Sequence, residues 1–316
     1  MRRFWAIFFI FWPILALWIC LKSPDYGWWF PTTTSADGVS ENPLGRRIDD
    51  LFYMILYVTT IVFIGTQIGL CYVLWTGTKD PEDDVDETGA PRKALFSHGS
   101  HNLEVMWTIV PAGILLFIAL YQMDVWAEFR VQTQFPDAIA KGVASVGITP
   151  DRSLGVPGHG TISHSGNALA EVTARQFEWR IRYPGFDADG NLLPLTLNPQ
   201  PTDLYDVNEL HILSGVPTMI QLKTQDVQHS FFLPELRVKQ DAVPGLVIPV
   251  WMQADKSTTY SLLCAELCGW GHYKMKARVV AESPEEFLAY LRKLQEEQFD
   301  DGVRTESADD EMLAAE

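Results

Sequence analysis

The sequence lacks the features that mark several large classes of protein. Its 316 residues contain no glycine-rich phosphate loop, no hydrolytic triad and no basic patch of the kind that binds nucleic acid. No C-x-x-C-H sequence is present, so the chain carries no covalently attached haem. Cysteine is scarce, with four residues in all. We therefore expect no nucleic-acid partner, and the few cysteines become the most informative residues.

The acidity of the chain is concentrated in two segments. The formal net charge is −16, but residues 79–93 contribute −3 and residues 296–316 contribute −8, which leaves −5 for the remainder. The overall charge is therefore weak evidence that the folded part binds a basic partner. We expect residues 299–316 to be an acidic disordered tail, because they offer little apolar surface to bury.

Of three apolar runs, two predict membrane helices and the N-terminal one is ambiguous. Residues 51–75 contain no charged residue and are long enough to cross the hydrocarbon core, and residues 105–123 form a second run. Together they predict a transmembrane helical hairpin over 48–126. Residues 1–30 begin with two arginines and continue with an apolar stretch, which favours a secretory signal peptide. They lack a clear cleavage site, so an extra membrane helix is the alternative.

Basic residues give a direction of insertion. Three basic residues lie in the loop between the two hairpin helices and three flank their outer ends, so these six cancel. The N-terminal Arg2 and Arg3 decide the balance and place the hairpin loop in the cytoplasm. The C-terminal part of the chain is then expected outside.

The region after the membrane helices predicts an all-β domain followed by one helix. Residues 127–169 are an inserted connection rich in Gly, Ser and Pro, in which we assign no metal role to His159 and His164. Short strands with turns between them are typical of a sandwich or barrel over residues 170–283. The expected strands are 171–183, 209–213, 218–224, 246–253, 259–264 and 276–281. Ser283, Pro284 and Glu286 form the start of a helix over 284–298.

One loop carries a set of soft metal ligands. Cys264, Cys268, His272 and Met275 lie within twelve positions, and His229 lies 35 residues before the first of them. Thiolate, thioether and imidazole ligands favour copper, and two bridging thiolates hold two copper ions with one histidine on each. A disulfide or a tetrahedral zinc site would also use these cysteines. Neither gives Met275 a role.

The chain resembles subunit II of haem-copper cytochrome c oxidases, the copper-A subunit. The resemblance lies in five ordered segments, which are residues 104–111 at the start of the second hairpin helix, the aromatic segment 176–185, the segments 226–234 and 238–245 around the first histidine, and the ligand loop 264–275. It implies a membrane-anchored protein with a cupredoxin-like Greek-key β-barrel. It also implies a dinuclear copper-A centre held by His229, Cys264, the carbonyl of Glu266, Cys268, His272 and Met275.

The resemblance also implies roles for two carboxylates and two aromatic residues. The Glu266 side chain would reach a magnesium or manganese ion shared with subunit I, and Glu104 would lie at the mouth of a proton channel into that subunit. In members of the family, electrons from cytochrome c enter subunit II at a tryptophan. This chain has Phe177 at the corresponding position. Trp179 is retained two residues on, and strand alternation would put both rings on one face.

The function implied is acceptance of electrons from cytochrome c, free or membrane-bound, and their passage to the haems of subunit I, where oxygen is reduced to water with proton pumping. The expected partners are subunits I and III and membrane lipid, and the expected location is the bacterial cytoplasmic membrane with the copper domain on the periplasmic side. A copper-A nitric oxide reductase and a membrane-tethered copper carrier or assembly protein are the alternatives. A quinol oxidase subunit would share the fold but would lack the copper ligands.

Overall fold

The computed structural model of the chain describes residues 2–26, 28, 42–76, 88, 99–130, 136–150 and 167–299. They belong to two compact units. The helical unit is formed by residues 1–29 and 47–127, and the β unit by residues 30–46 and 128–316.

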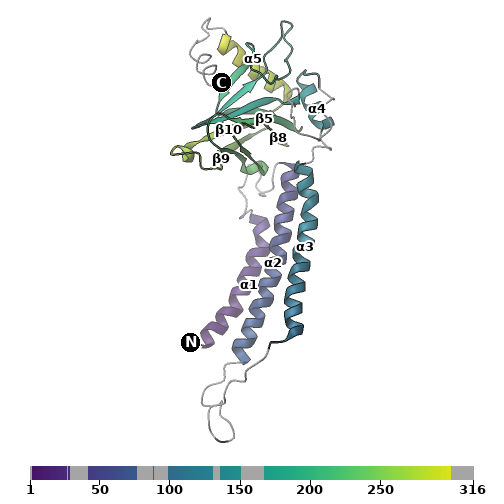
Figure 1. Cartoon of the computed structure of the whole chain (residues 1–316), viewed down its shortest axis with the longest axis vertical. Helices are drawn as coiled ribbons and strands as arrows, with labels where there is room; N and C mark the ends of the chain where they lie inside the picture. Colours follow the sequence, from purple (N-terminus) through teal and green to yellow (C-terminus); the bar gives the residue numbers. More distant parts are fainter. Residues whose placement is uncertain are drawn as a thin grey trace. The chain divides into compact units, whose positions relative to one another are not determined.

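The helical unit contains three long helices that lie side by side (Figure 1). They are α1 (Arg2–Tyr26), α2 (Pro43–Thr76) and α3 (His101–Arg130), and each is long and apolar enough to cross a membrane. The predicted hairpin is therefore confirmed as a pair of helices. The Thr60 hydroxyl lies 3.2 Å from the sulfur of Cys20, so α1 contacts α2. Whether α1 is a leader or a retained third helix stays a prediction.

Two features of α3 agree with the sequence pattern. Pro111 lies inside the helix, where a membrane helix tolerates it because neighbouring groups satisfy the freed backbone carbonyl. Glu104 lies exposed in the first turn, where an acid is favoured by the helix dipole. The helix continues to Arg130, four residues beyond the end that we predicted.

The β unit contains two five-stranded sheets. The first has the strand order β3-β2-β1-β5-β8 and the second has the order β4-β10-β9-β6-β7. The strands are β1 (Ala170–Arg175), β2 (Glu178–Tyr183), β3 (Leu204–Val207), β4 (Glu209–Leu213), β5 (Thr218–Thr224), β6 (His229–Leu233), β7 (Val238–Ala242), β8 (Ile248–Met252), β9 (Thr259–Cys264) and β10 (Lys276–Glu282), with short 3-10 turns η4 (Pro234–Leu236) and η5 (His272–Lys274).

The two sheets face each other across one apolar core. The strands alternate as a half-buried sheet requires, so that on β10 Ala277 and Val279 are buried and Arg278 is exposed. At the centre of the core, the ring of Trp179 meets Phe231 edge to face at 5.7 Å, and both rings are fully buried. These two side chains join the sheets, because Trp179 belongs to β2 and Phe231 to β6.

The predicted strands are partly confirmed. Those at 209–213, 218–224 and 259–264 match β4, β5 and β9 residue for residue. The single strand predicted over 171–183 is wrong, because Gln176 and Phe177 form a turn and Arg175 pairs with Glu178 across an antiparallel hairpin. Strands β3, β6 and β7 were not predicted.

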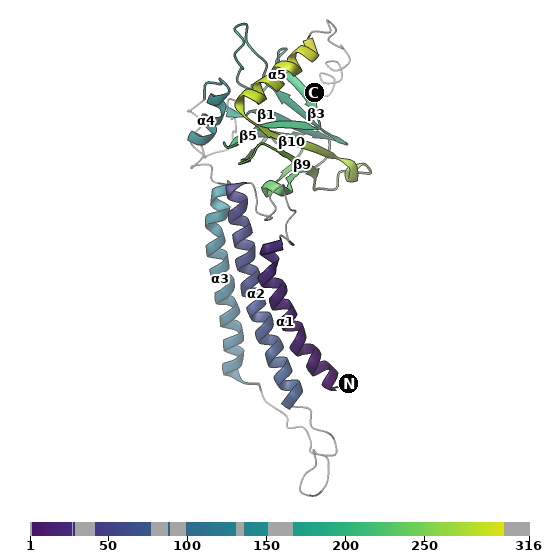
Figure 2. The same ribbon diagram turned by 180° about the vertical axis from the view of Figure 1, so that it is seen from behind.

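The expected C-terminal helix is confirmed as α5 (Pro284–Phe299). Its first turn is held by a capping box, in which the Glu286 amide donates to the Ser283 hydroxyl at 3.3 Å and the Ser283 amide donates to the Glu286 carboxylate at 2.9 Å. Phe287 and Leu291 are buried, and α5 packs across β3 and β4 (Figure 2). Residues 300–316, which make up almost all of the predicted disordered tail, lie outside the described residues.

The inserted connection contains a helix that the sequence did not predict. Helix α4 (Pro136–Ser145) buries Ile139 and Val143 and packs against β5 (Figure 2). No helix was predicted within the connection over 127–169, and its assignment as an inserted segment stays a prediction. His159 and His164 lie outside the described residues.

Candidate metal centre

The predicted ligands converge at one end of the β unit because of the strand order. His229 is the first residue of β6 and Cys264 is the last residue of β9. These strands are antiparallel neighbours, with Phe231 opposite Cys264, so the start of one lies beside the end of the other. Cys268 follows in the loop between β9 and β10, which we call the ligand loop (residues 264–275).

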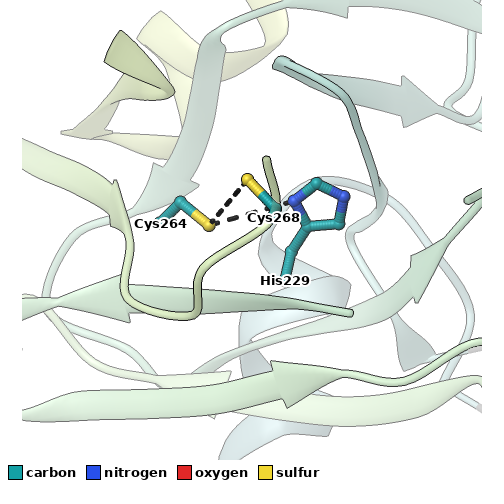
Figure 3. A group of neighbouring side chains, drawn as sticks. All are labelled: His229, Cys264 and Cys268. Carbon is teal, nitrogen blue, oxygen red and sulfur yellow. Dashed lines mark hydrogen bonds between the residues drawn. The ribbon is translucent and has the colours of Figure 1, made fainter. Parts of the chain in front are cut away.

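The two cysteine sulfurs form the centre of the cluster. They are 3.8 Å apart, far beyond a disulfide bond, and both thiols are free. Figure 3 shows them facing each other beside the imidazole of His229, and the ligand atoms of these three residues all lie within 4.8 Å of one another. The disulfide alternative is therefore wrong for this structure, and the cluster has the composition of a soft-metal site.

Each sulfur has its own set of neighbours. Cys264 Sγ lies 3.9 Å from His229 Nδ1 and 3.2 Å from the carbonyl oxygen of Glu266. Cys268 Sγ lies 3.6 Å from His272 Nδ1 and 3.8 Å from the sulfur of Met275. One imidazole and one weak donor therefore accompany each sulfur.

The ring of His229 is oriented by a carboxylate. Its Nε2 lies 2.8 Å from Asp226 Oδ1, so a proton on Nε2 is donated to Asp226 and leaves the lone pair of Nδ1 directed toward Cys264. The imidazole is fully buried, and Trp179 meets it at 6.3 Å between ring centroids. Such carboxylate–histidine contacts fix the tautomer of metal-binding histidines.

The turn between β1 and β2 connects the two segments that supply ligands. The Gln176 amide donates to Asp226 Oδ2 at 2.7 Å, and its side-chain nitrogen donates to the carbonyl of Cys268 at 2.5 Å. Gln176 thus joins the loop before His229 to the ligand loop. The roles of Gln176 and Asp226 were not predicted, and the only signal in the sequence was that Asp226 lies three residues before a histidine.

Phe177 covers the ligand loop. Its ring lies so close to Gly271 that a Cβ added there would come within 2.5 Å of two ring atoms. Gly269 has a φ of +131°, and a Cβ there would come within 2.7 Å of the side-chain nitrogen Nε2 of Gln176. The two glycines on either side of Trp270 are therefore required for this close approach.

The two thiols differ strongly in acidity. Burial raises the pKa of Cys264, but contacts with His229 and with backbone amides outweigh burial and lower that pKa to about 6. Burial and the neighbouring charge of Cys264 raise the pKa of Cys268 to about 12. Without a metal, the pair therefore holds one proton at neutral pH, and a cation that binds both sulfurs must displace that proton.

The other predicted site residues lie in four different settings. Trp179 is fully buried in the core, whereas Phe177 is half-buried in the turn, so the prediction that alternation places both rings on one face of a strand is wrong. Glu266 is half-buried in the ligand loop. Glu104 belongs to the helical unit.

Two family models match the chain. "Cytochrome C oxidase subunit II, periplasmic domain" matches residues 170–283, and "Cytochrome C oxidase subunit II, transmembrane domain" matches residues 37–125. The two matches together cover more than half of the chain.

Similar proteins have the same family name. The alternative cytochrome c oxidase subunit 2 of Bradyrhizobium diazoefficiens is 35% identical over 139 residues, which cover 39% of this chain and 50% of that protein. Cytochrome c oxidase subunit 2 of Thermostichus vulcanus is 26% identical over 279 residues, which cover 78% of this chain and 75% of that protein. Among solved structures, the periplasmic domain of subunit II of cytochrome oxidase of Bradyrhizobium japonicum is 22% identical with a TM-score of 0.35, and the match covers 43% of this chain and 99% of that one.

Proposed function

The chain belongs to the family of cytochrome c oxidase subunit II, and we propose that it is the electron-accepting subunit of a respiratory terminal oxidase. It accepts electrons from cytochrome c and passes them to the haems of subunit I, where oxygen is reduced to water with proton pumping. The observation that carries the proposal is the pair of free sulfurs 3.8 Å apart, each with its own imidazole.

The donor set fits two copper ions. Cys264 and Cys268 would be shared between them, while His229 and His272 would each bind one. Met275 and the carbonyl of Glu266 would be weak ligands, in keeping with their places beside different sulfurs. When bound, the copper pair supplies one-electron acceptance and donation.

The residues of the chain hold this donor set in place. The contacts of Asp226 with His229 and with the Gln176 amide fix one imidazole, and the Gln176 side chain fixes the carbonyl of Cys268. Full burial of His229 excludes water from that side of the site. Because these contacts involve only side chains and loops anchored on strands, the geometry need not change when an electron arrives. A site that is already arranged for both redox states has little to reorganise.

Further roles follow from family membership. We assign the Glu266 carboxylate to a magnesium or manganese ion shared with subunit I, because hard cations prefer oxygen ligands. We assign Glu104 to the mouth of a proton channel. The chain would assemble with subunits I and III in the bacterial cytoplasmic membrane, with the β unit on the periplasmic side.

A copper count with electron paramagnetic resonance tests the main proposal. The full-length chain in detergent, loaded with copper, should hold two copper ions and give the seven-line pattern of an electron shared by two equivalent nuclei. Cys268→Ser should hold one ion or none and lose the shared pattern. Cys71→Ser, a change of the same chemistry in α2, should behave as the original chain does. One exchangeable copper with a four-line pattern would contradict the proposal and favour a copper carrier.

A further inference from the structure

The ligand loop exposes three large apolar side chains. Leu267 is 79% exposed, Trp270 is 76% exposed and Tyr273 is 74% exposed. Aromatic side chains at such exposure contribute nothing to the core, and apolar surface grouped in this way is typical of a contact site for another molecule. The loop that carries the metal ligands therefore also exposes apolar surface to solvent.

Of these three exposed side chains, Trp270 is the one that packs against Phe177, the ring that covers the ligand loop. It lies two residues from Cys268 and two from His272. Its ring meets Phe177 edge to face at 5.1 Å, and Phe177 in turn rests on the backbone of Gly271. A continuous contact thus leads from solvent to the loop between two ligands. Among the described residues, neither Leu267 nor Tyr273 makes a comparable contact with Phe177.

The charge of this surface is balanced. The ligand loop contains one acid, Glu266, and one lysine, Lys274, whose ammonium group lies 4.5 Å from the centre of the Trp270 ring. A surface with a neutral sum and a central tryptophan offers short-range apolar contact rather than long-range steering by charge. It fits a partner whose contact area is also apolar.

We propose that Trp270 is the contact residue for the electron donor, a protein that presents the exposed edge of a haem within an apolar rim. This inference rests on the proposed function. The donor haem iron is oxidised from Fe(II) to Fe(III), and the copper pair gains that one electron. No bond forms or breaks, no proton moves and Trp270 itself is unchanged. Trp179 does not serve this role, because it is fully buried.

Binding of a redox-inert donor tests the proposal apart from turnover. Cytochrome c with zinc in place of iron is titrated onto the purified oxidase complex, and the dissociation constant is measured by calorimetry. Trp270→Ala should weaken binding about 30-fold, because an aromatic anchor at the centre of an interface typically carries that share of the affinity. Trp270→Phe should retain most of it. Reduction of the oxidase by a small soluble reductant should be the same in both variants as in the original protein.

Leu197→Ala is the matched control. Leu197 is 53% exposed and lies in the segment that follows β2, at the end of that strand away from the Gln176–Phe177 turn. It should not affect donor binding. The affinity of the unaltered complex should also change little between low and physiological salt.

Four results of the binding and reduction measurements would overturn the proposal. They are unchanged donor binding in Trp270→Ala, an equal loss in Leu197→Ala, a steep loss of affinity with salt, and slower reduction of Trp270→Ala by the small reductant. A lower amount of the Trp270→Ala chain in the purified complex would also overturn it, by showing that another subunit covers this residue. Failure of the proposed function is separate, since it appears as a wrong copper count in the unaltered chain.

Discussion

Replacing Gly271 by alanine adds one methyl group directly against the ring of Phe177. The added Cβ would lie 2.5 Å from Cγ and from Cδ2 of the ring. Carbon atoms in contact are normally about 3.5–4.0 Å apart, so the ring or the ligand loop must move by about 1 Å. The backbone conformation is compatible with alanine, because Gly271 has a φ of −92°, which alanine adopts readily.

The loss of stability caused by Gly271→Ala depends on how firmly the ring of Phe177 is held. The residue before Phe177 is tied by hydrogen bonds to Asp226 and to the carbonyl of Cys268, so the turn cannot move without loosening both ligand-bearing segments. Forcing an extra carbon into packed surroundings typically costs about 1–3 kcal/mol. We expect Gly271→Ala to lower the stability of the β unit by that amount and to disturb the copper spectrum.

A double-mutant cycle isolates the contact. The free energy of unfolding is measured by urea titration of the detergent-solubilised chain, with circular dichroism of the sheets as the signal. In a Phe177→Ala background, Gly271→Ala should cost almost nothing, because the space is empty. Gly113→Ala is the control for the substitution itself, since nothing lies within 4 Å of its added Cβ. An equal cost of Gly271→Ala with and without the Phe177 ring would show that the ring does not clash with the added methyl group.

Three further predictions concern the metal site and the C-terminal helix. Asp226→Asn should weaken copper binding about 10–100-fold in a competition with a chelator, because the amide orients the His229 ring less firmly than a carboxylate does; equal affinity would deny that role. Copper affinity should rise at least tenfold per pH unit around neutral pH, because Cys268, with its pKa raised to about 12, must lose a proton on binding, and the pKa of His229 is also raised, since contacts with Cys264 and Asp226 outweigh burial. The rise should be steeper at acid pH, where Cys264, with a pKa of about 6, is protonated too, and a flat profile would contradict both shifts. Ser283→Ala should cost about 1 kcal/mol in urea unfolding through the lost helix cap, and no change would show that the cap is redundant.

The metal ligands could be predicted from the sequence because they are almost all local. Cys264, Cys268, His272 and Met275 lie in a single loop, and their spacing alone indicates soft-metal chemistry. Only His229 had to be brought from elsewhere, and the antiparallel pairing of β6 with β9 brings it there. The membrane helices were equally predictable, since a long apolar run without charged residues is typical of a membrane-spanning helix.

The turn at Gln176 and Phe177 could not be predicted in the same way. The turn contains neither glycine nor proline to mark a reversal, and the alternation of polar and apolar residues is broken only by the two consecutive polar residues Arg175 and Gln176. The prediction of one strand therefore placed Phe177 and Trp179 on a common face, whereas one ring covers the ligand loop and the other lies in the core. The exposure of Trp270 was hidden for the same reason, because it depends on which side of the loop Phe177 occupies.

The distribution of ligands between one loop and one strand end has an evolutionary consequence. Beneath the site, Trp179 and Phe231 join the two sheets without supplying any ligand atom. Four of the five ligand side chains are therefore encoded in one short stretch of the gene, and His229 lies in a barrel strand. Exchange of that short stretch would remove most of the copper ligands and leave the core that joins the two sheets unaltered.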